Sequence, residues 1–171
     1  FIIFDTLDVV PHDSTDTVFI GDENGVSESA IQIPLEFDAR LKTLEFVGAI
    51  RNVFSETTTN PLLIRIYEGE DLPNETPVYE SIEVINAELL YLSPNNHSGV
   101  YLFTLNPTNI SLRPGQFWLS ISNLANPETD FFWELDPMMF GGGFMSAKRN
   151  FEQPWVIVPR SRNIKVIGER I

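Results

Sequence analysis

The chain has few side chains that could carry out nucleophilic catalysis. It has two histidines, His12 and His97, and no cysteine, so a thiolate nucleophile is excluded and an imidazole base has two candidates. Both histidines lie in polar segments typical of loops, and the sequence has no Gly-x-Ser-x-Gly elbow. A metal site with several imidazole ligands would need both of them. We therefore expect neither nucleophilic hydrolysis nor histidine-based metal chemistry.

Paired carboxylates are the second kind of chemistry to consider. Glu134 and Asp136 are two residues apart, so on a strand their side chains share a face. Glycosidases use two carboxyl groups separated by about 5 Å or by about 6.5–9.5 Å. The chain has 24 acidic residues, however, and such a spacing arises often by chance at that frequency. A hydrolase that uses this pair is therefore kept only as a remote alternative.

The segment Gly21-Asp22-Glu23-Asn24-Gly25 alternates oxygen-bearing side chains between two glycines. Asp22 and Asn24 are the candidate ligands for a structural calcium ion, because Ca²⁺ binds carboxylate and amide oxygens. The segment lacks the Glu that an EF-hand loop places six residues after its glycine. An ordinary turn is the favoured interpretation, and no cofactor is expected to be required.

Aromatic side chains offer a binding function instead of a catalytic one. Sugar rings stack on exposed aromatic faces, so the candidate ligand-binding residues are Tyr67, Trp118, Trp133 and Trp155. The alternative is packing in the core, which is the commoner fate of a tryptophan. The sequence favours packing at each position and leaves the ligand platform open.

Residues 112–123 form the stretch around which these candidates are organised. Pro114-Gly115 predicts a turn, since proline fixes φ and glycine accepts a positive φ. After the turn, apolar side chains at 117, 119 and 121 alternate with Trp118 and two serines. This period of two predicts a central strand with one face in a core and a mostly polar second face.

Other short apolar runs predict neighbouring strands, and no segment shows a convincing helical period. Many short strands at spacings of about 8–12 residues favour a sandwich or barrel. We therefore predict an all-β fold, a two-sheet antiparallel β-sandwich of jelly-roll type, in a single domain spanning 1–171. The predicted strands are 1–10, 18–20, 31–37, 41–50, 62–67, 78–85, 89–92, 100–105, 131–135, 151–158 and 164–167.

Two strands carry a prediction about sheet edges. Pro34 lies within an alternating run and cannot donate a ladder hydrogen bond, so that strand is expected at an edge. Phe1-Ile2-Ile3-Phe4 is entirely apolar and is a liability if left in solvent. This strand is expected to pair either inside its own sheet or with a neighbouring molecule, as a partner strand in a homo-oligomer.

The charge of the chain excludes some partners. Its formal net charge is −13, which repels phosphate backbones and anionic membrane surfaces, so neither nucleic acid nor membrane insertion is expected. No apolar run approaches the roughly 18 residues that a transmembrane helix needs. The first methionine is Met138, so Phe1 is not a translation start and we expect a processed product or a piece of a longer protein.

Two stretches resemble a jelly-roll-like module of secreted and cell-surface bacterial proteins. Arg65-Ile66-Tyr67-Glu68 with Leu72-Pro73 is similar to its R-I-Y-E…L-P-G hairpin. Residues 112–121 are similar to its L-x-x-G-x-Y-W-L-S-I strand, and Trp133 and Trp155 match further tryptophans of the pattern. Asn74 departs from the glycine usual in the hairpin. The resemblance covers about residues 41–158 and implies an extracellular β-sandwich, with no catalytic residues to transfer.

The sequence therefore predicts a non-catalytic module, secreted or on the cell surface, that serves adhesion or recognises a glycan or a protein. The first alternative is a self-assembling structural subunit of a filament or surface layer, joined by β-strand addition. The second alternative is the glycan-active hydrolase.

Overall fold

The computed structural model describes most of the chain, and within the described residues all the regular elements are β-strands. This confirms the all-β class predicted from period-two alternation. The described residues are 1–7, 19–22, 27–51, 53, 55–93, 98–123, 131–134, 146–150, 153–158 and 162–171.

The strands vary widely in length, and every pairing between them is antiparallel. Their bounds are β1 (Ile2–Asp5), β2 (Phe19–Asp22), β3 (Ser27–Leu35), β4 (Ala39–Arg51), β5 (Thr57–Glu68), β6 (Tyr79–Ser93), β7 (Ser98–Leu105), β8 (Ser111–Leu112), β9 (Gly115–Ser122), β10 (Phe131–Glu134), β11 (Ser146–Asn150), β12 (Val156–Val158) and β13 (Ile164–Arg170).

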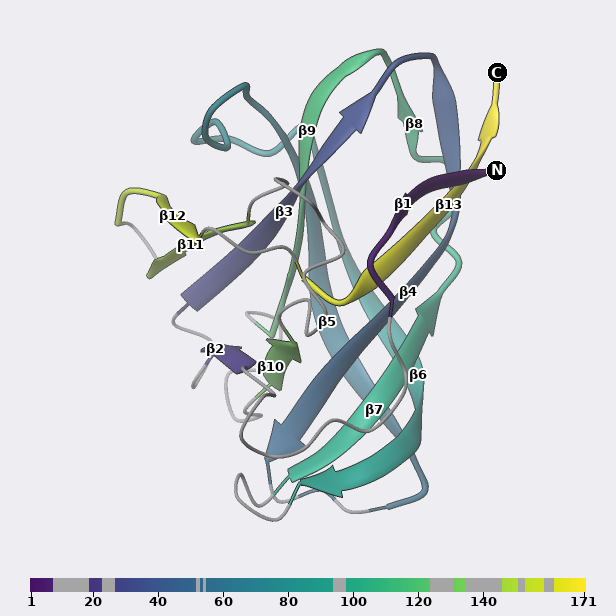
Figure 1. The fold of residues 1–171 in the computed structure, drawn as a ribbon, viewed down its shortest axis with the longest axis vertical. Helices are drawn as coiled ribbons and strands as arrows, with labels where there is room; N and C mark the ends of the chain where they lie inside the picture. Colours follow the sequence, from purple (N-terminus) through teal and green to yellow (C-terminus); the bar gives the residue numbers. More distant parts are fainter. Residues whose placement is uncertain are drawn as a thin grey trace.

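All these strands belong to one open antiparallel hydrogen-bonded sheet (Figure 1). Its path is β1-β13-β4-β7-β6-β5-β9-β3-β11-β12, so β1 and β12 are its two ends. β10 pairs with β2 and β4, and β8 pairs with β4, off this path. The strand ends that carry the N- and C-termini of the chain lie close together because β1 pairs with β13.

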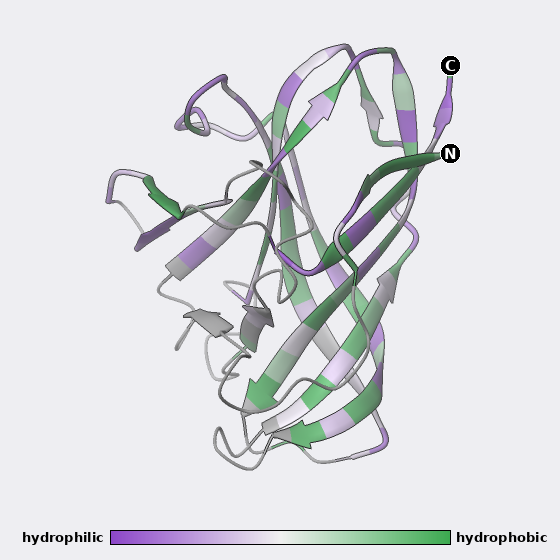
Figure 2. Ribbon diagram, in the orientation of Figure 1, coloured by the Kyte–Doolittle hydropathy of each residue, from purple (hydrophilic) through white to green (hydrophobic). Residues whose placement is uncertain are grey.

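One large hydrophobic cluster, the main core, collects the inward side chains of both halves of the sheet. Ile33 on β3 and Leu119 on β9 belong to it, as do Phe46 on β4, Phe103 on β7 and Val166 on β13. The rings of Phe46 and Phe103 stack at 5.0 Å between centroids. Figure 2 shows the hydrophobic and hydrophilic residues alternating along β4 and β7, as burial of one strand face requires.

The position of the central strand was predicted correctly. β9 lies between β5 and β3, and its apolar face at 117, 119 and 121 joins the main core. The opposite face was expected to be mostly polar, with packing favoured for Trp118. Trp118 is buried, and so are the two polar residues Ser120 and Ser122. Trp118 belongs to a second cluster that β11 and β12 help to build on the outward face of the sheet.

Several strand boundaries differ from the sequence prediction, among them those of β5 and β6. Residues 57–60 were expected to lie in a loop, but they extend β5 and pair with 85–88 of β6. β6 is one strand from Tyr79 to Ser93, where two strands were predicted. The expected break at 86–88 pairs with 57–59 of β5 and with 102–104 of β7, so the strand continues through it. Threonine suits strands, so Thr57–Thr59 pair readily once β6 provides a partner.

The edge prediction for Pro34 holds for half of its strand. β3 pairs with β9 on one side along 30–35, but β11 covers its other side only at 27–31. Pro34 therefore lies past the end of the β3–β11 pairing, and its missing N–H leaves no hydrogen bond to β11 unmade. Within the part of the chain that the structure describes, no helix has the length and apolar character that a membrane crossing needs.

Candidate functional site

A buried carboxylate on the outward face of the sheet is the centre of the most highly connected polar site in the described residues. Glu28 on β3 is 2% exposed, and its Oε1 accepts hydrogen bonds from the Tyr67 hydroxyl at 2.7 Å and from Ser120 Oγ at 2.8 Å. Its Oε2 lies 3.3 Å from Arg65 Nη1 and 3.2 Å from Arg149 Nε. We call these five residues the Glu28 cluster.

The strand registers bring these five residues together. Arg65 and Ser120 are direct cross-strand partners on β5 and β9, and Glu28 and Arg149 are partners on β3 and β11. Four neighbouring strands therefore each contribute a side chain to one face. Because side chains on a strand alternate, Tyr67 lies on the same face as Arg65.

The outer rim of the cluster is acidic. Arg65 Nε lies 2.6 Å from Glu80 Oε2, and Arg149 Nη1 lies 3.7 Å from Glu75 Oε2. Glu80 and Glu75 are exposed, whereas the two guanidinium groups are mostly covered. Each arginine therefore bridges a buried carboxylate and an exposed one.

The electrostatics keep Tyr67 and Arg65 in their ordinary protonation states at neutral pH. Burial raises the pKa of Tyr67, and the negative charge and hydrogen bond of Glu28 raise it further, so the phenol remains a proton donor. Burial lowers the pKa of Arg65, but the hydrogen bond to Glu80 and the charge of Glu28 outweigh it, and the pKa is raised overall. The arginine stays charged.

The arrangement suits holding strands together better than catalysis. Glu28 has hydrogen-bond or ion-pair partners on both oxygens and almost no contact with solvent. A general acid or base must reach a proton on a substrate, and this carboxylate is enclosed. A buried carboxylate that is fully paired avoids the large cost of an uncompensated buried charge.

Three of the four aromatic candidates for ligand binding lie together on this face of the sheet, and one of them, Tyr67, belongs to the Glu28 cluster itself. Tyr67 and Trp155 contact edge to face, with ring centroids 5.4 Å apart. The Arg149 guanidinium carbon lies 4.4 Å from the centre of the Trp155 ring, a cation–π distance. Trp118 belongs to the same cluster, and its Nε1 donates to the Gly69 carbonyl at 2.9 Å. The convergence of these rings could not be read from their spacing in the sequence.

Trp133, the fourth aromatic candidate, lies in the main core on β10. Its Nε1 donates to the Asn163 carbonyl at 3.4 Å, and Arg162 Nη1 donates to the Trp133 carbonyl at 3.2 Å. All four candidate rings are buried, with exposed fractions of 0% for Tyr67 and 6% or less for the tryptophans. A ligand-binding role for them stays a prediction, and it requires ring faces that this structure covers.

The outward face of the β5–β6 ladder shows an apolar patch that sequence reasoning did not single out. Ile82 and Val84 on β6 are 63% and 70% exposed, opposite Leu63 and Pro61 on β5. β7 pairs only with 86–93 of β6, so Ile82 and Val84 lie on the half of β6 that has β5 as its one strand partner in the described residues. We call these four residues the β6 patch.

Polar groups flank the β6 patch at both ends. At one end lies the ion pair of Arg65 with Glu80. At the other, Asn86 and Glu88 help to line a shallow hollow of about 420 Å³ together with Thr57–Thr59. The ladder thus presents an apolar centre between polar ends.

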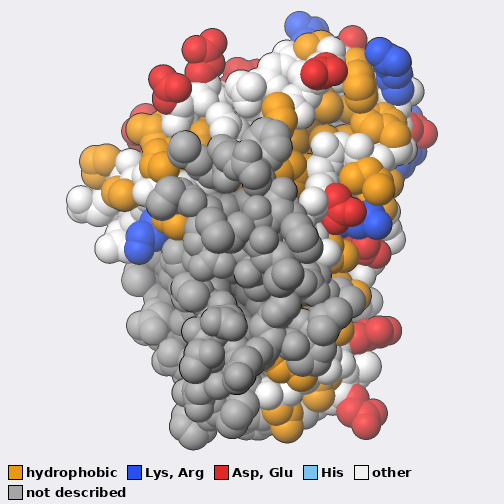
Figure 3. All heavy atoms as spheres, in the orientation of Figure 1, with side chains coloured by type: hydrophobic (Ala, Val, Ile, Leu, Met, Phe, Trp, Pro, Cys, Tyr) orange, Lys and Arg blue, Asp and Glu red, His pale blue; other side chains and the backbone are white. Residues whose placement is uncertain are grey.

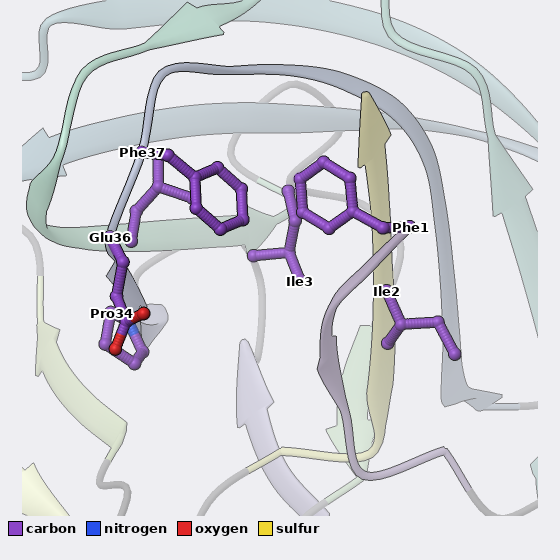
Figure 4. A pocket seen from close by; sticks show the side chains of 7 residues that line it. Phe1, Ile2, Ile3, Pro34, Glu36 and Phe37 are labelled. Carbon is purple, nitrogen blue, oxygen red and sulfur yellow. The ribbon is translucent and has the colours of Figure 1, made fainter. Parts of the chain in front are cut away.

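The partner-strand residues Phe1, Ile2, Ile3 and Phe4 pair inside their own chain in this structure. β1 runs antiparallel to β13, with Ile2 opposite Ile167 and Phe4 opposite Val166. This is one of the two outcomes that the sequence left open. On its other side β1 borders an open pocket of about 290 Å³, which the end of β3 and the following turn also line (Figure 4).

Several other predicted residues are outside the described residues or lack described side chains. Asn24 is outside them, and Asp22 pairs by its backbone with Phe131 while its side chain is not described. Asp136 also lies outside the described residues. So do both histidines, His12 and His97. Among the residues that are described, no three acidic, histidine or cysteine side chains form a group that could hold a metal ion.

Sequence reasoning missed Glu28 and Arg149, the two residues that carry the buried ion pair. Glu28 alternates out of phase with Ile31 and Ile33, which predicts a solvent-facing position. It is buried because the side chains of Tyr67, Ser120, Arg65 and Arg149 surround its carboxylate. β11 (Ser146–Asn150), which contributes Arg149, has no apolar alternation that would predict it. The one available signal was Arg65-Ile66-Tyr67-Glu68, where a cation and a phenol share a strand face.

Comparisons of this chain with protein-family models, with curated proteins and with solved structures found no match.

Proposed function

We propose that this chain is a non-catalytic extracellular module that recognises another molecule, in adhesion or in ligand binding. The observation that carries the proposal is the β6 patch. Two neighbouring aliphatic side chains on one strand face, each more than 60% exposed, cost solvation free energy unless a partner covers them. The enclosed state of Glu28 supports a non-catalytic role.

The same observations favour a protein over a glycan as the ligand. Carbohydrate recognition by stacking needs open aromatic faces, and the candidate rings Tyr67, Trp118, Trp133 and Trp155 are buried. The β6 patch is aliphatic, and aliphatic side chains pack well against the apolar centre of a protein interface.

We further propose that the sheet folds into two stacked layers of jelly-roll type. The support is that inward residues from β3 and β9 share the main core with residues from β4, β7 and β13. Two sheet halves that bury one common core are the arrangement of a β-sandwich. The extracellular location rests on the resemblance of the Arg65–Glu68 and 112–121 segments to secreted modules.

The test is binding of the labelled chain to a glycan array and to a panel of purified extracellular proteins. The informative variant is Ile82→Lys/Val84→Lys, which charges the β6 patch without disturbing buried groups. Its matched control is Val156→Lys, which charges an equally exposed valine on β12. We expect protein ligands that lose binding with the double variant only. A wild-type chain that binds nothing on either panel contradicts the proposal.

A structural calcium ion at Asp22 and Asn24 remains part of this proposal as an accessory feature. Its test is calorimetric titration with CaCl₂ of wild type and of Asp22→Ala. A heat of binding that is present in wild type and absent in Asp22→Ala supports the calcium site. A wild-type titration without heat, together with a melting temperature that CaCl₂ does not change, contradicts it.

A self-assembling structural subunit is the second candidate function. The observation that favours it is that both ends of the sheet path expose apolar side chains, Ile2 on β1 and Val156 on β12. A head-to-tail contact between two different edges propagates without closing and produces filaments. Electron microscopy at high protein concentration distinguishes such filaments from discrete particles.

A further inference from the structure

The exposed face of β6 has an acidic residue at each end of an apolar centre. Every second residue from 80 to 88 is exposed, and the residues between them are half-buried or buried. The exposed residues are Glu80, Ile82, Val84, Asn86 and Glu88, which we call the β6 row. At about 3.3 Å per residue, its two carboxylates lie roughly 26 Å apart along the strand. The row therefore offers aliphatic contact at its centre and negative charge at both ends.

The chain around the β6 row is strongly acidic. Residues 66–112 contain seven acidic side chains and no lysine or arginine. Those seven negative charges are more than half of the formal net charge of −13. Figure 3 shows acidic and hydrophobic side chains along the lower right flank, the side on which β6 runs in Figure 1, and basic side chains at the upper right. A cationic partner is therefore attracted to this side of the molecule.

Arg65, the basic residue of the β5–β6 ladder, does not neutralise the row. It lies between two carboxylates, with Nη1 3.3 Å from Glu28 and Nε 2.6 Å from Glu80. The ion-pair network that includes Arg149 and Glu75 sets three carboxylates against two guanidinium groups, so it keeps a net negative charge. The Glu80 side chain is still 51% exposed. It can accept a further cation from a partner.

The face of β6 suits a partner better than its edge does. β7 pairs only with 86–93, so the edge of 79–85 opposite β5 has no strand partner in the described residues. Glu83 is the cross-strand partner of Leu62, a main-core residue, so its side chain points to the inward face, where Ser81 donates to it at 2.9 Å. An inward charge on a strand edge opposes the addition of another strand.

We propose that a basic, aliphatic segment of a partner protein covers the β6 row. Its lysine or arginine residues pair with Glu80 and Glu88, and its aliphatic side chains pack on Ile82 and Val84. This inference rests on the proposed function, since it names the kind of protein that the β6 patch recognises. Apolar burial supplies affinity, and the acidic surroundings accelerate encounter and select against acidic partners.

A second copy of this chain does not fit the same row. Two copies that met through their β6 faces would bring acidic residues 68–88 of one against those of the other. Like charges across a contact weaken it and slow its formation. Sedimentation velocity of the chain alone tests this point, and self-association that Ile82→Ser/Val84→Ser abolishes would overturn the proposal of a basic partner.

The probes for the test are three fluorescein-labelled synthetic peptides with the same centre of alternating valine and threonine. They carry lysine, glutamine or glutamate at two positions that have the same spacing as Glu80 and Glu88. Fluorescence anisotropy measures their binding to the full chain. We expect the lysine peptide to bind at least about tenfold more tightly than the glutamate peptide at about 20 mM NaCl, and to weaken as NaCl is raised to about 150 mM.

Two double variants separate the apolar contact from the charge. Ile82→Ser/Val84→Ser removes the aliphatic centre, and Glu80→Gln/Glu88→Gln removes the carboxylates at its ends. The matched control is Glu36→Gln/Asp38→Asn, which changes the net charge equally in the exposed turn between β3 and β4. Each row variant should weaken the lysine peptide at least about threefold, and the control should change its affinity much less. Circular dichroism checks that all variants fold.

Three further results would overturn the proposal. The first is a lysine peptide that wild type binds no better than the glutamate peptide, and the second is no binding at about 1 mM. The third is an equal loss in the control and in Glu80→Gln/Glu88→Gln. Failure of the proposed function is different, because protein ligands would then bind Ile82→Lys/Val84→Lys as well as wild type. An acidic protein that the same variant fails to bind would keep the proposed function and overturn this inference.

Discussion

The Tyr67 hydroxyl donates a 2.7 Å hydrogen bond to Glu28 and accepts one of 3.1 Å from Arg149 Nη2. One phenol thus connects the buried carboxylate on β3 to the guanidinium group on β11. Tyr67 itself stands on β5, so the contact ties together three strands that lie far apart in the sequence. The stability of the outward aromatic cluster should therefore depend on the charge of Glu28 and on the proton of Tyr67.

Neutralising Glu28 should destabilise the fold strongly. Glu28→Gln keeps the shape of the side chain but leaves the mostly covered Arg65 and Arg149 with only the exposed carboxylates of Glu80 and Glu75 as charge partners. Removing one partner of a buried ion pair costs about 3–5 kcal/mol of unfolding free energy. Urea denaturation followed by circular dichroism measures the loss.

The matched control for Glu28→Gln is Glu80→Gln, which removes an exposed carboxylate from the same Arg65. An exposed ion pair contributes about 0–1 kcal/mol, so this variant should remain close to wild type. Equal losses of unfolding free energy in the two variants would contradict the prediction, because burial of Glu28 would then add nothing to the stability of its ion pairs.

The Tyr67 proton should make the fold sensitive to alkaline pH. Because the pKa of Tyr67 is raised above its usual 10.0 in the folded state, the folded chain holds this proton where the unfolded chain releases it. The stabilisation is fully present below pH 10 and is lost as the pH rises beyond that value. Tyr67→Phe should be less stable than wild type by about 1–3 kcal/mol near neutral pH, through loss of a hydrogen bond to a charged group.

The informative quantity is how the difference in unfolding free energy between wild type and Tyr67→Phe changes with pH. At about pH 11 the gap between wild type and Tyr67→Phe should narrow by about 1 kcal/mol, since only wild type has this phenol to titrate. Tyr101 also has a pKa raised by burial, but it is present in both proteins and cancels in the comparison. A gap that stays constant from about pH 8 to about pH 11 would show that Tyr67 ionises as freely in the folded chain as in the unfolded one.

Gly69 should tolerate no side chain, because it shapes the turn that caps Trp118. It adopts φ +144°, and a Cβ added there would lie 2.0 Å from the Leu72 carbonyl oxygen. Gly69→Ala must therefore move backbone and weaken the bond from Trp118 Nε1 to the Gly69 carbonyl, at a cost of about 2–4 kcal/mol.

Gly115 provides the comparison that separates the clash from the backbone angle. It has a similar φ of +151°, but its added Cβ meets only the Phe117 ring at 3.8 Å. Gly115→Ala should thus lose only the conformational part, about 1–2 kcal/mol. Thermal unfolding of both variants checks the order, and a larger loss at Gly115 would contradict the steric account.

Period-two patterns predicted the strands whose inward faces build the core. The run at 117–121 alternates cleanly, and the structure places it at the centre of the sheet. Pattern reasoning failed where burial comes from a distant segment. Nothing near Glu28 in the sequence indicates that Arg149 of β11 will pair with it. β11 has the sequence Ser-Ala-Lys-Arg-Asn, in which no large apolar side chain marks an inward face.

The aromatic candidates show the same limit in another form. Residue type singled out Tyr67, Trp118 and Trp155, and the structure gathers them in one cluster. Whether their faces are open depends on the turn at Gly69 and on the β11–β12 pair, which are tertiary features. Residue type therefore identifies the candidate rings, but it does not decide whether they pack in a core or bind a ligand.

Quenching of tryptophan fluorescence decides that question in solution. Trp118, Trp133 and Trp155 are 1%, 1% and 6% exposed, so acrylamide should quench the native protein far less than the urea-unfolded chain. Variants that retain one tryptophan, with phenylalanine at the other two positions, assign the signal to each ring. A strongly quenched Trp155 or Trp118 would mean that the β11–β12 cover opens in solution. That result would again make Trp118 and Trp155 candidates for stacking on a glycan. Equal protection of all three tryptophans from acrylamide would leave the β6 patch as the candidate recognition surface.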